Sequence, residues 1–191
     1  MKIAGIGALI GLLFVFAFPQ TNDLGQNTFA NEQGPIILVV DAGLADLKLD
    51  SPYVMFVAYM GAKKEQNMTI SRDDVVMVYN GQEYKMPSIK ELRKNYKGQN
   101  SDRDIYRHLG KEGVIASAMR FYQFRNQYDF FPVLGQRSTL PGQDGSISGY
   151  IGFKTRLYFK NPGFKKGDKL LIKVRDMKAP DLSGEVEVTL K

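Results

Sequence analysis

The chain has 191 residues, and its 26 lysine and arginine residues against 20 aspartate and glutamate residues give a formal net charge of +6. A composition of 43% hydrophobic and 24% charged residues is typical of one folded globular domain, and it excludes disordered, collagenous and low-complexity classes. Within this chain, the absence of cysteine excludes disulfides, thiolate metal sites and cysteine nucleophiles, and a single histidine excludes a multi-histidine metal site. We therefore expect no metal site and no cofactor.

The N-terminal residues predict a secretory signal. Lys2 is followed by an apolar run over residues 3–18, and Pro19 opens a polar stretch. A positive charge, a short apolar segment and a polar boundary are the three parts of a signal peptide. We expect residues 1–17 to be this signal peptide, with cleavage after Ala17, and the mature chain to be periplasmic or extracellular.

An uncleaved membrane anchor is the alternative for the same segment. The apolar run is somewhat shorter than the about 20 residues that span a bilayer comfortably. Gly7 and Gly11 have the GxxxG spacing that would let two anchors pack together. Export without disulfides is common in a bacterial envelope, and it argues against a nucleic-acid partner.

The first half of the mature chain predicts strands. Residues 18–34 are rich in Asn, Gln, Gly and Thr without a sustained apolar period, so a flexible mature N-terminus is expected before a folded domain over 35–191. Asn80-Gly81 is a two-residue hairpin signal between two strands. Apolar and β-branched runs place the strands at 36–40, 53–60, 68–71, 75–79 and 82–86.

A helical insertion is expected near residues 88–112. Ser88 and Glu91 form a capping box, which predicts a helix that runs to about Tyr96. A second N-cap signal at 101–104 predicts a short helix that Gly110 closes. The aromatic-rich stretch that follows is interpreted as a strand covered on both faces.

The C-terminal third alternates apolar and polar residues along three consecutive segments, 151–160, 169–175 and 185–190. A period of two on each segment indicates an antiparallel sheet with one face in the core. No long amphipathic helix separates these segments, which argues against parallel βαβ units. The predicted fold is mainly β, an antiparallel β-sandwich with the helical insertion near 88–112.

Enzyme signals are weak in this sequence. His108 is the one histidine available for a catalytic triad, and no Gly-x-Ser-x-Gly motif accompanies it. Asp73-Asp74 and Asp102 with Asp104 are the paired carboxylates, but spacing in sequence does not fix the separation that glycoside hydrolysis requires. Turn and helix-start roles explain both pairs without catalysis. No catalytic residue is therefore predicted.

Calcium and nucleotide motifs are incomplete. Asn100, Asp102 and Asp104 resemble the start of a calcium loop, but Ile105 replaces the expected glycine and Lys111 the final glutamate. No GxxxxGK[ST] motif occurs.

Basic residues concentrate in the C-terminal strands. Residues 154–178 hold nine lysines and arginines against two aspartates, whereas residues 18–62 hold five acids and one lysine. This asymmetry predicts either a surface for an anionic partner or a solvated sheet face on which glutamates 185 and 187 pair with cations across a hairpin. The candidate ligand-binding residues here are Lys154, Arg156, Lys173 and Arg175.

A second candidate group mixes aromatic and basic residues in the run Arg120-Phe-Tyr-Gln-Phe-Arg125. Such a mixture suits stacking on a sugar or a base, whereas the simpler interpretation assigns most of the rings to the core. Arg120, Tyr122 and Arg125 are the speculative ligand-binding residues of this run.

Two stretches resemble a pattern in uncharacterised exported bacterial proteins with an immunoglobulin-like β-sandwich. They are residues 74–93, which contain the Asn-Gly hairpin, and residues 157–170, which contain Asn-Pro-Gly before Lys-Gly-Asp-Lys-Leu. The resemblance covers about half of the mature chain. It implies an immunoglobulin-like fold and an exported location, and it carries over no activity or site residue.

The expected function is therefore a non-enzymatic binding or interaction module of the cell envelope. Its partner would be an envelope protein, or an anionic glycan or lipid headgroup. The alternatives are an envelope carbohydrate-active enzyme that uses carboxylates such as Asp73 or Asp102, and a membrane-anchored display domain that keeps its N-terminal helix.

Overall fold

The computed structural model describes residues 20–63, 66–109, 112–125, 128–132 and 140–191. The predicted signal peptide, its cleavage point and the membrane-anchor alternative lie outside these residues, as does Gly110 at the predicted helix end.

The larger sheet has eight strands and is built around the apolar runs of the sequence. β4 (Tyr53–Ala62) lies between β3 (Ile36–Asp41) and β12 (Ile151–Lys160) and pairs antiparallel with both. Every residue of β3 and β4 is buried, because both faces of these central strands are covered. The outer strands are β1 (Asn22–Gly25), β2 (Thr28–Asn31), β11 (Asp144–Ser148), β5 (Asn67–Ser71) and β8 (Gln123–Arg125), the last paired parallel with β12.

The smaller sheet has four strands and follows the alternation of the sequence. Its order is β14 (Ser183–Thr189), β13 (Lys169–Arg175), β6 (Val75–Tyr79) and β7 (Gln82–Lys85), all antiparallel. The turn between β6 and β7 has positive φ at both central residues, 50° at Asn80 and 77° at Gly81. This backbone is the one that an Asn-Gly hairpin provides, so the predicted hairpin is confirmed.

One face of each sheet forms the core between them. Leu170, Ile172 and Val174 of β13 are buried, whereas their neighbours Leu171 and Lys173 are partly exposed. The sheets approach closely where β14 passes β3, because a Cβ at Gly184 would lie 2.5 Å from the Ile36 carbonyl oxygen. The predicted class, mainly antiparallel β with two sheets and few helices, is confirmed.

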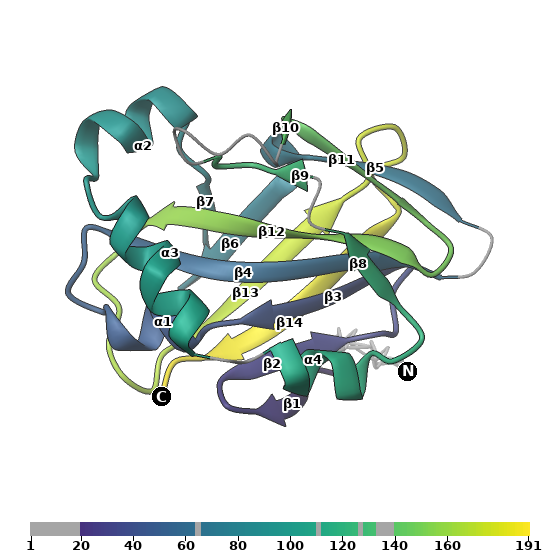
Figure 1. Cartoon of the computed structure of the whole chain (residues 1–191), viewed down its shortest axis with the longest axis horizontal. Coiled ribbons are helices and arrows are strands. Elements are labelled where there is room, and N and C mark those ends of the chain that lie inside the picture. The colour runs from purple at the N-terminus through teal and green to yellow at the C-terminus, as the bar shows by residue number, and fades with distance from the viewer. Residues whose placement is uncertain (1–19, 64–65, 110–111, 126–127, 133–139) are drawn as a thin grey trace, which may run out of the picture.

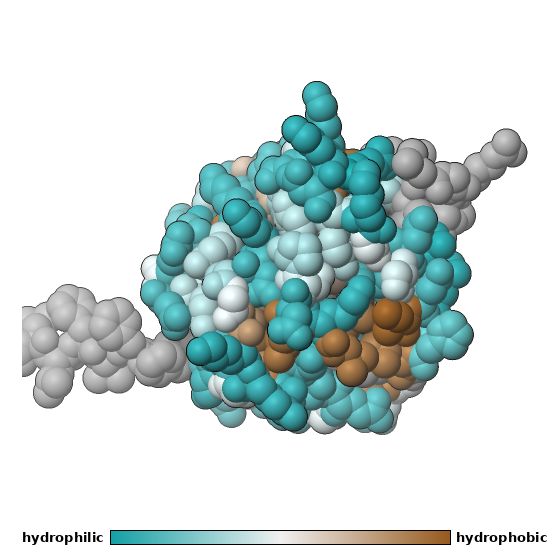
Figure 2. Space-filling view, turned by 90° about the vertical axis from the view of Figure 1, so that its left-hand side faces the viewer, coloured by the Kyte–Doolittle hydropathy of each residue, from teal (hydrophilic) through white to brown (hydrophobic). Residues whose placement is uncertain are grey.

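Helices cover the other face of the larger sheet. In Figure 1, α1 (Gly43–Leu47), α3 (Gln99–His108) and α4 (Glu112–Ala118) lie in front of this sheet, and β13 and β14 lie behind it. α2 (Ile89–Asn95) begins as predicted, because the Ser88 hydroxyl accepts the Glu91 amide at 3.1 Å. The end of the molecule that carries α1, α2 and α3 is mostly hydrophilic, with apolar atoms gathered in one patch (Figure 2).

Two expectations about local structure are corrected. Residues 22–25 and 28–31 form strands instead of a flexible terminus, because β2 pairs with β3 and this pairing overrides a polar composition. The aromatic-rich stretch begins with the helix α4, on which Ile115 is buried, and Met119 is buried one turn further on. The short strands β8 and β9 (Tyr128–Asp129) follow, and β9 pairs parallel with β10 (Leu140–Pro141).

Candidate functional site

The seven residues that the sequence nominates for ligand binding lie in three separate places. The first group lies at β8, the second lies on the helix-covered face of the larger sheet, and the third lies on the outer face of the smaller sheet. They are Arg120, Tyr122 and Arg125 at β8, Lys154 and Arg156 on β12, and Lys173 and Arg175 on β13.

The cations of β13 are paired with glutamates. Lys173 lies opposite Glu185 in the β13–β14 register, and its Nζ is 3.7 Å from a carboxylate oxygen of Glu185, as the cross-strand interpretation predicts. Arg175 does not pair with Glu187, because its guanidinium reaches across to β7 and lies 3.8 Å from Glu83. Glutamates therefore neutralise both cations on this sheet face.

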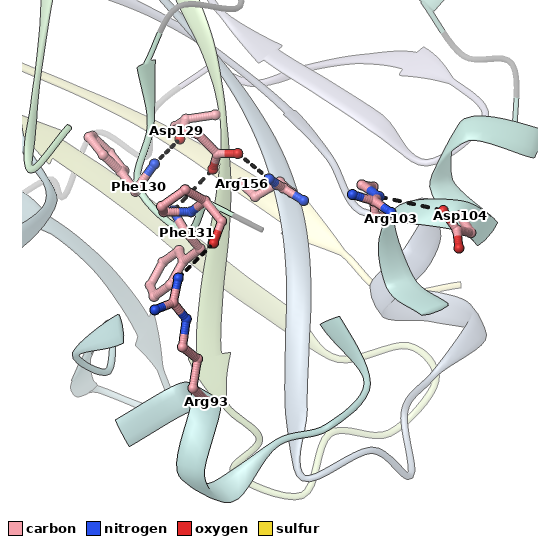
Figure 3. A network of polar contacts seen from close by, with 9 residues as sticks. Arg93, Arg103, Asp104, Asp129, Phe130, Phe131 and Arg156 are labelled. Carbon is pink, nitrogen blue, oxygen red and sulfur yellow. Dashed lines mark hydrogen bonds and ion pairs between the residues drawn. The ribbon is translucent and has the colours of Figure 1, made fainter. Parts of the chain in front are cut away.

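The Arg156 side chain on β12 forms an ion pair within the protein. Its guanidinium forms an ion pair with Asp129, and both side chains are largely buried (Figure 3). Asp129 also accepts the Phe131 amide at 3.0 Å, and the hydroxyl of Thr155 accepts the Phe130 amide at 3.0 Å. These contacts hold the segment 128–132 along β12, so Arg156 is committed to an internal pair.

A buried polar cluster connects α3 to the segments that follow α1 and α2, and it lies beside Tyr158 of the larger sheet. The Tyr96 hydroxyl lies 2.9 and 2.8 Å from the two carboxylate oxygens of Asp102, which is 1% exposed, and Lys48 forms an ion pair with the same carboxylate. Burial lowers the pKa of Lys48, but the Asp102 carboxylate outweighs this effect and raises it overall. Burial raises the pKa of Tyr158 on β12, and Asp102 raises it further.

One helical turn after Asp102, Tyr106 makes a second contact with the sheet. Its hydroxyl lies 3.3 Å from the Tyr59 hydroxyl, and Lys154 Nζ lies 5.4 Å from the Tyr59 ring centre and 5.3 Å from that of Tyr106. Burial raises the pKa of Tyr106, with Tyr59 and Asp41 adding to the effect. The i, i+4 spacing of Asp102 and Tyr106 is the sequence signal for this inward helix face.

The most exposed aromatic side chains lie around β8. Phe121 is 70% exposed and Tyr150 is 47% exposed, and Ile151 beside it is 37% exposed. The Arg120 guanidinium stacks over the Phe121 ring at 5.2 Å from its centre. We name this region the aromatic–arginine surface, and its members are Arg120, Phe121, Tyr122, Arg125, Tyr150 and Ile151.

Parallel pairing of β8 with β12 builds this surface from two turns. The Gln123 amide donates to the Tyr150 carbonyl at 2.8 Å, and Gln123 lies opposite Ile151 in the register. The Tyr122 ring centre is 5.7 Å from that of Tyr150, and a Cβ at Gly61 would lie 3.0 Å from the Tyr122 ring. Sequence reasoning found Tyr122 but missed Tyr150 and Ile151, because only the tertiary pairing places them there.

The arginines of this surface differ from the cations elsewhere. Among the residues that the structure describes, no carboxylate forms an ion pair with Arg120 or Arg125, and both residues are exposed. The nearby acid is Glu32, which adds to burial in raising the pKa of Tyr122. The surface therefore combines exposed rings with two arginines that form no ion pair with a carboxylate of the described residues.

The two carboxylate pairs differ in their surroundings. Asp73 has a side chain that is 68% exposed, and burial followed by the charge of Asp73 raises the pKa of Asp74. Asp102 is buried against the sheet, whereas the Asp104 side chain is 57% exposed on the same helix. His108 is exposed, and its Nδ1 lies 2.6 Å from the backbone carbonyl of Asp104. The charges of Asp144 and Asp176 also raise the pKa of Asp74, so further carboxylates lie near the Asp73-Asp74 pair.

Metal-binding groups and membrane-spanning helices are both absent from the described part of the chain. There, no group of three or more His, Asp or Glu side chains could hold a metal ion, and the three residues of the suspected calcium loop lie on α3. No described helix is both long and apolar enough to cross a membrane. Comparison with known proteins finds no matching family model, no matching curated protein and no matching solved structure.

Proposed function

We propose that the protein is an exported, non-enzymatic binding module of the bacterial cell envelope, with an immunoglobulin-like two-sheet body. Its aromatic–arginine surface would hold an anionic partner. The observation that carries this proposal is the combination of Phe121, 70% exposed, with two arginines that no described carboxylate neutralises. Exposed aromatic side chains beside arginines are the composition of interaction surfaces.

The other basic groups of the protein support this choice by their own contacts. Lys173 and Arg175 lie near glutamates, and Arg156 forms its pair with Asp129. Lys154 lies under α3 against two tyrosine rings. An anion that approached any of these cations would have to displace an existing partner, which costs part of the gain.

The contacts of Asp102 and Asp73 also support a binding role over an enzymatic one. The Asp102 carboxylate accepts a hydrogen bond from Tyr96 and forms an ion pair with Lys48. Both contacts fix the position of α3. Asp73 lies next to Arg72 and accepts the Gln143 side-chain amide at 3.0 Å. These contacts favour structural roles for both residues that the enzyme alternative would use.

The binding proposal is tested with two double variants that remove the same charge from different faces. The mature chain 18–191 is titrated against dextran sulfate at low ionic strength, with uncharged dextran as the ligand control. Arg120→Gln with Arg125→Gln should weaken binding about 10-fold or more, because two unneutralised cations leave the contact surface. Lys173→Gln with Arg175→Gln should stay close to the unmodified chain. Equal losses in both variants, or no binding of dextran sulfate at all, would contradict the proposal.

Export is tested separately by N-terminal sequencing of the protein recovered from fractionated bacterial cells. A mature N-terminus at Phe18 in the envelope or the medium is expected. An intact N-terminus in the membrane fraction would support the anchored form instead, and intact protein confined to the cytoplasm would contradict export.

A further inference from the structure

The aromatic–arginine surface has an apolar part, which bears on the kind of partner that it binds. Phe121, Tyr150 and Ile151 are three of the large hydrophobic side chains that the described structure leaves exposed, at 70%, 47% and 37%. Phe121 lies in the turn before β8, and Tyr150 with Ile151 lies at the turn between β11 and β12. The hydrogen bond from Gln123 to Tyr150 holds the two turns side by side.

From these observations we infer that the surface docks on an anionic lipid bilayer, with Phe121, Tyr150 and Ile151 entering the headgroup region and Arg120 and Arg125 contacting lipid phosphates. This inference rests on the proposed function, because it names the anionic partner of the same surface. Tyrosine rings and apolar side chains at loop tips settle at the boundary between headgroups and acyl chains, and nearby arginines attract an anionic leaflet.

An acidic glycan is the rival partner, and the apolar residues argue against it. Ile151 has no flat face on which a sugar ring could stack, and Phe121 offers no hydrogen bond to a hydroxyl group. Gln123 is exposed on β8 and Glu32 lies near Tyr122, but these polar groups do not account for the exposure of Phe121 and Ile151. The lipid surface uses all three apolar side chains as well as both cations, so it accounts for more of what is exposed.

The rigid base beneath the surface supports docking as a preformed unit. Tyr122 stacks against Phe124 with ring centres 6.0 Å apart, and Phe124 meets Tyr59 edge-on at 5.3 Å. Tyr59 is 5% exposed and belongs to the central strand β4. Because the Tyr122 ring also meets that of Tyr150 at 5.7 Å, Tyr150 is connected to the core through a continuous set of rings, and its docking requires little ordering of the side chain.

An exposed apolar residue on another face of the described structure serves as the matched control. Leu47 on α1 is 64% exposed, and α1 lies at the end of the molecule that Figure 2 shows as mostly hydrophilic with one apolar patch. Its chain neighbours Asp46, Lys48 and Asp50 carry no excess of positive charge that would attract an anionic bilayer. Phe121→Ser and Leu47→Ser thus each remove one largely exposed apolar side chain. Phe121 lies beside exposed arginines, whereas Leu47 lies near two aspartates and one lysine.

The experiment measures sedimentation of the mature chain 18–191 with vesicles of phosphatidylcholine alone and with vesicles that contain phosphatidylglycerol. This chain contains both sheets and all of the core described above, and it lacks the apolar N-terminal run that would bind any vesicle. We expect binding only to the phosphatidylglycerol vesicles. Phe121→Ser, and separately Arg120→Gln with Arg125→Gln, should each lower the partition coefficient about 10-fold, and Leu47→Ser should leave it unchanged.

Parallel titration with dextran sulfate tests anion binding by the surface separately from its docking on a lipid bilayer. If dextran sulfate binds through the arginines but the vesicles do not bind, or bind equally well after Phe121→Ser, the lipid inference is overturned and the proposed function stands. If Leu47→Ser lowers vesicle binding as much as Phe121→Ser, the assignment to this surface is wrong. If neither anionic ligand binds, both the inference and the proposed function fail.

Discussion

Asp102 is the residue on which the attachment of α3 depends. It is 1% exposed, its carboxylate accepts the hydroxyl hydrogen of Tyr96, and it forms an ion pair with Lys48. Asp102→Asn removes the negative charge and leaves the Lys48 ammonium beside a neutral amide. We expect the free energy of unfolding to fall by about 2–4 kcal/mol, a range appropriate for a largely buried pair whose lysine keeps some contact with water.

Urea unfolding followed by circular dichroism measures this loss as a lower midpoint with an unchanged slope. Asp104→Asn is the control, because Asp104 lies two residues away on the same helix with an exposed side chain. The control should change the free energy of unfolding by less than about 0.5 kcal/mol. Equal effects of the two variants would show that the buried cluster is not what holds α3.

Asp168 should make the stability of the protein depend on acid pH. The Lys165 amide and the Tyr79 hydroxyl each donate to its carboxylate at 2.7 Å, and these hydrogen bonds, led by the Lys165 amide, lower the pKa of Asp168 below 3.8. A lowered pKa in the folded state contributes stability above the unfolded pKa, and this contribution is lost as the pH falls through the folded pKa. Asp168→Asn should therefore be less stable than the unmodified chain at pH 7 and similar to it at about pH 2.

This pH dependence is measured by urea unfolding of both chains at several pH values between the two limits. Asp181→Asn, at an exposed position before β14, is the matched carboxyl control. A constant difference in unfolding free energy between the unmodified chain and Asp168→Asn at every pH would contradict this role of Asp168.

At the scale of elements, two glycines should respond in opposite directions to the same substitution. Gly113 lies in α4, is exposed, and has no atom within 4 Å of an added Cβ, so Gly113→Ala should stabilise the protein by about 0.5–1 kcal/mol. Gly163 has equal space but a φ of +95°, which an alanine adopts only with strain. Gly163→Ala should destabilise by about 1 kcal/mol.

Thermal and urea unfolding of the two variants check this pair. A loss of stability in Gly113→Ala would mean that the backbone around Gly113 is not helical in solution, whereas a gain in Gly163→Ala would show that the turn before β13 relaxes easily.

Elements with a strong local signal could be predicted from the sequence, and elements created by tertiary pairing could not. The apolar run of β4, the Asn-Gly hairpin and the Ser88 cap each carry their own signal. β1 and β2 have polar sequences, and they become strands because β3 offers an edge with which they pair. α1, with five residues, is too short to produce a helical period and was not predicted.

The residues of the candidate site likewise fall into those with a local sequence signal and those that tertiary pairing brings together. Arg120, Tyr122 and Arg125 were found because aromatic and basic residues alternate in one short run. Tyr150 and Ile151 come from a turn about 25 residues further along the chain and reach this surface through the parallel β8–β12 pairing. A parallel pairing of three residues has no signature in a sequence that otherwise reads as antiparallel.

At the scale of the whole molecule, the two sheets and the helical layer divide the surface by charge. The outer face of the smaller sheet sets lysines against glutamates, for example Lys169 with Glu187 at 2.9 Å. Asp102 and Tyr106 of α3 face the larger sheet, and Lys154 of that sheet lies beneath the Tyr106 ring. Among the described residues, the aromatic–arginine surface is where exposed rings lie beside arginines that form no ion pair, and we therefore assign binding to it.

Hydrogen–deuterium exchange of the mature chain with and without phosphatidylglycerol vesicles tests this assignment most directly, because it reports on every face at once. We expect slower exchange on binding in peptides that contain residues 119–125 and 149–152, and unchanged exchange in β13 and β14. Protection confined to 169–175 and 183–189, with none around β8, would contradict it.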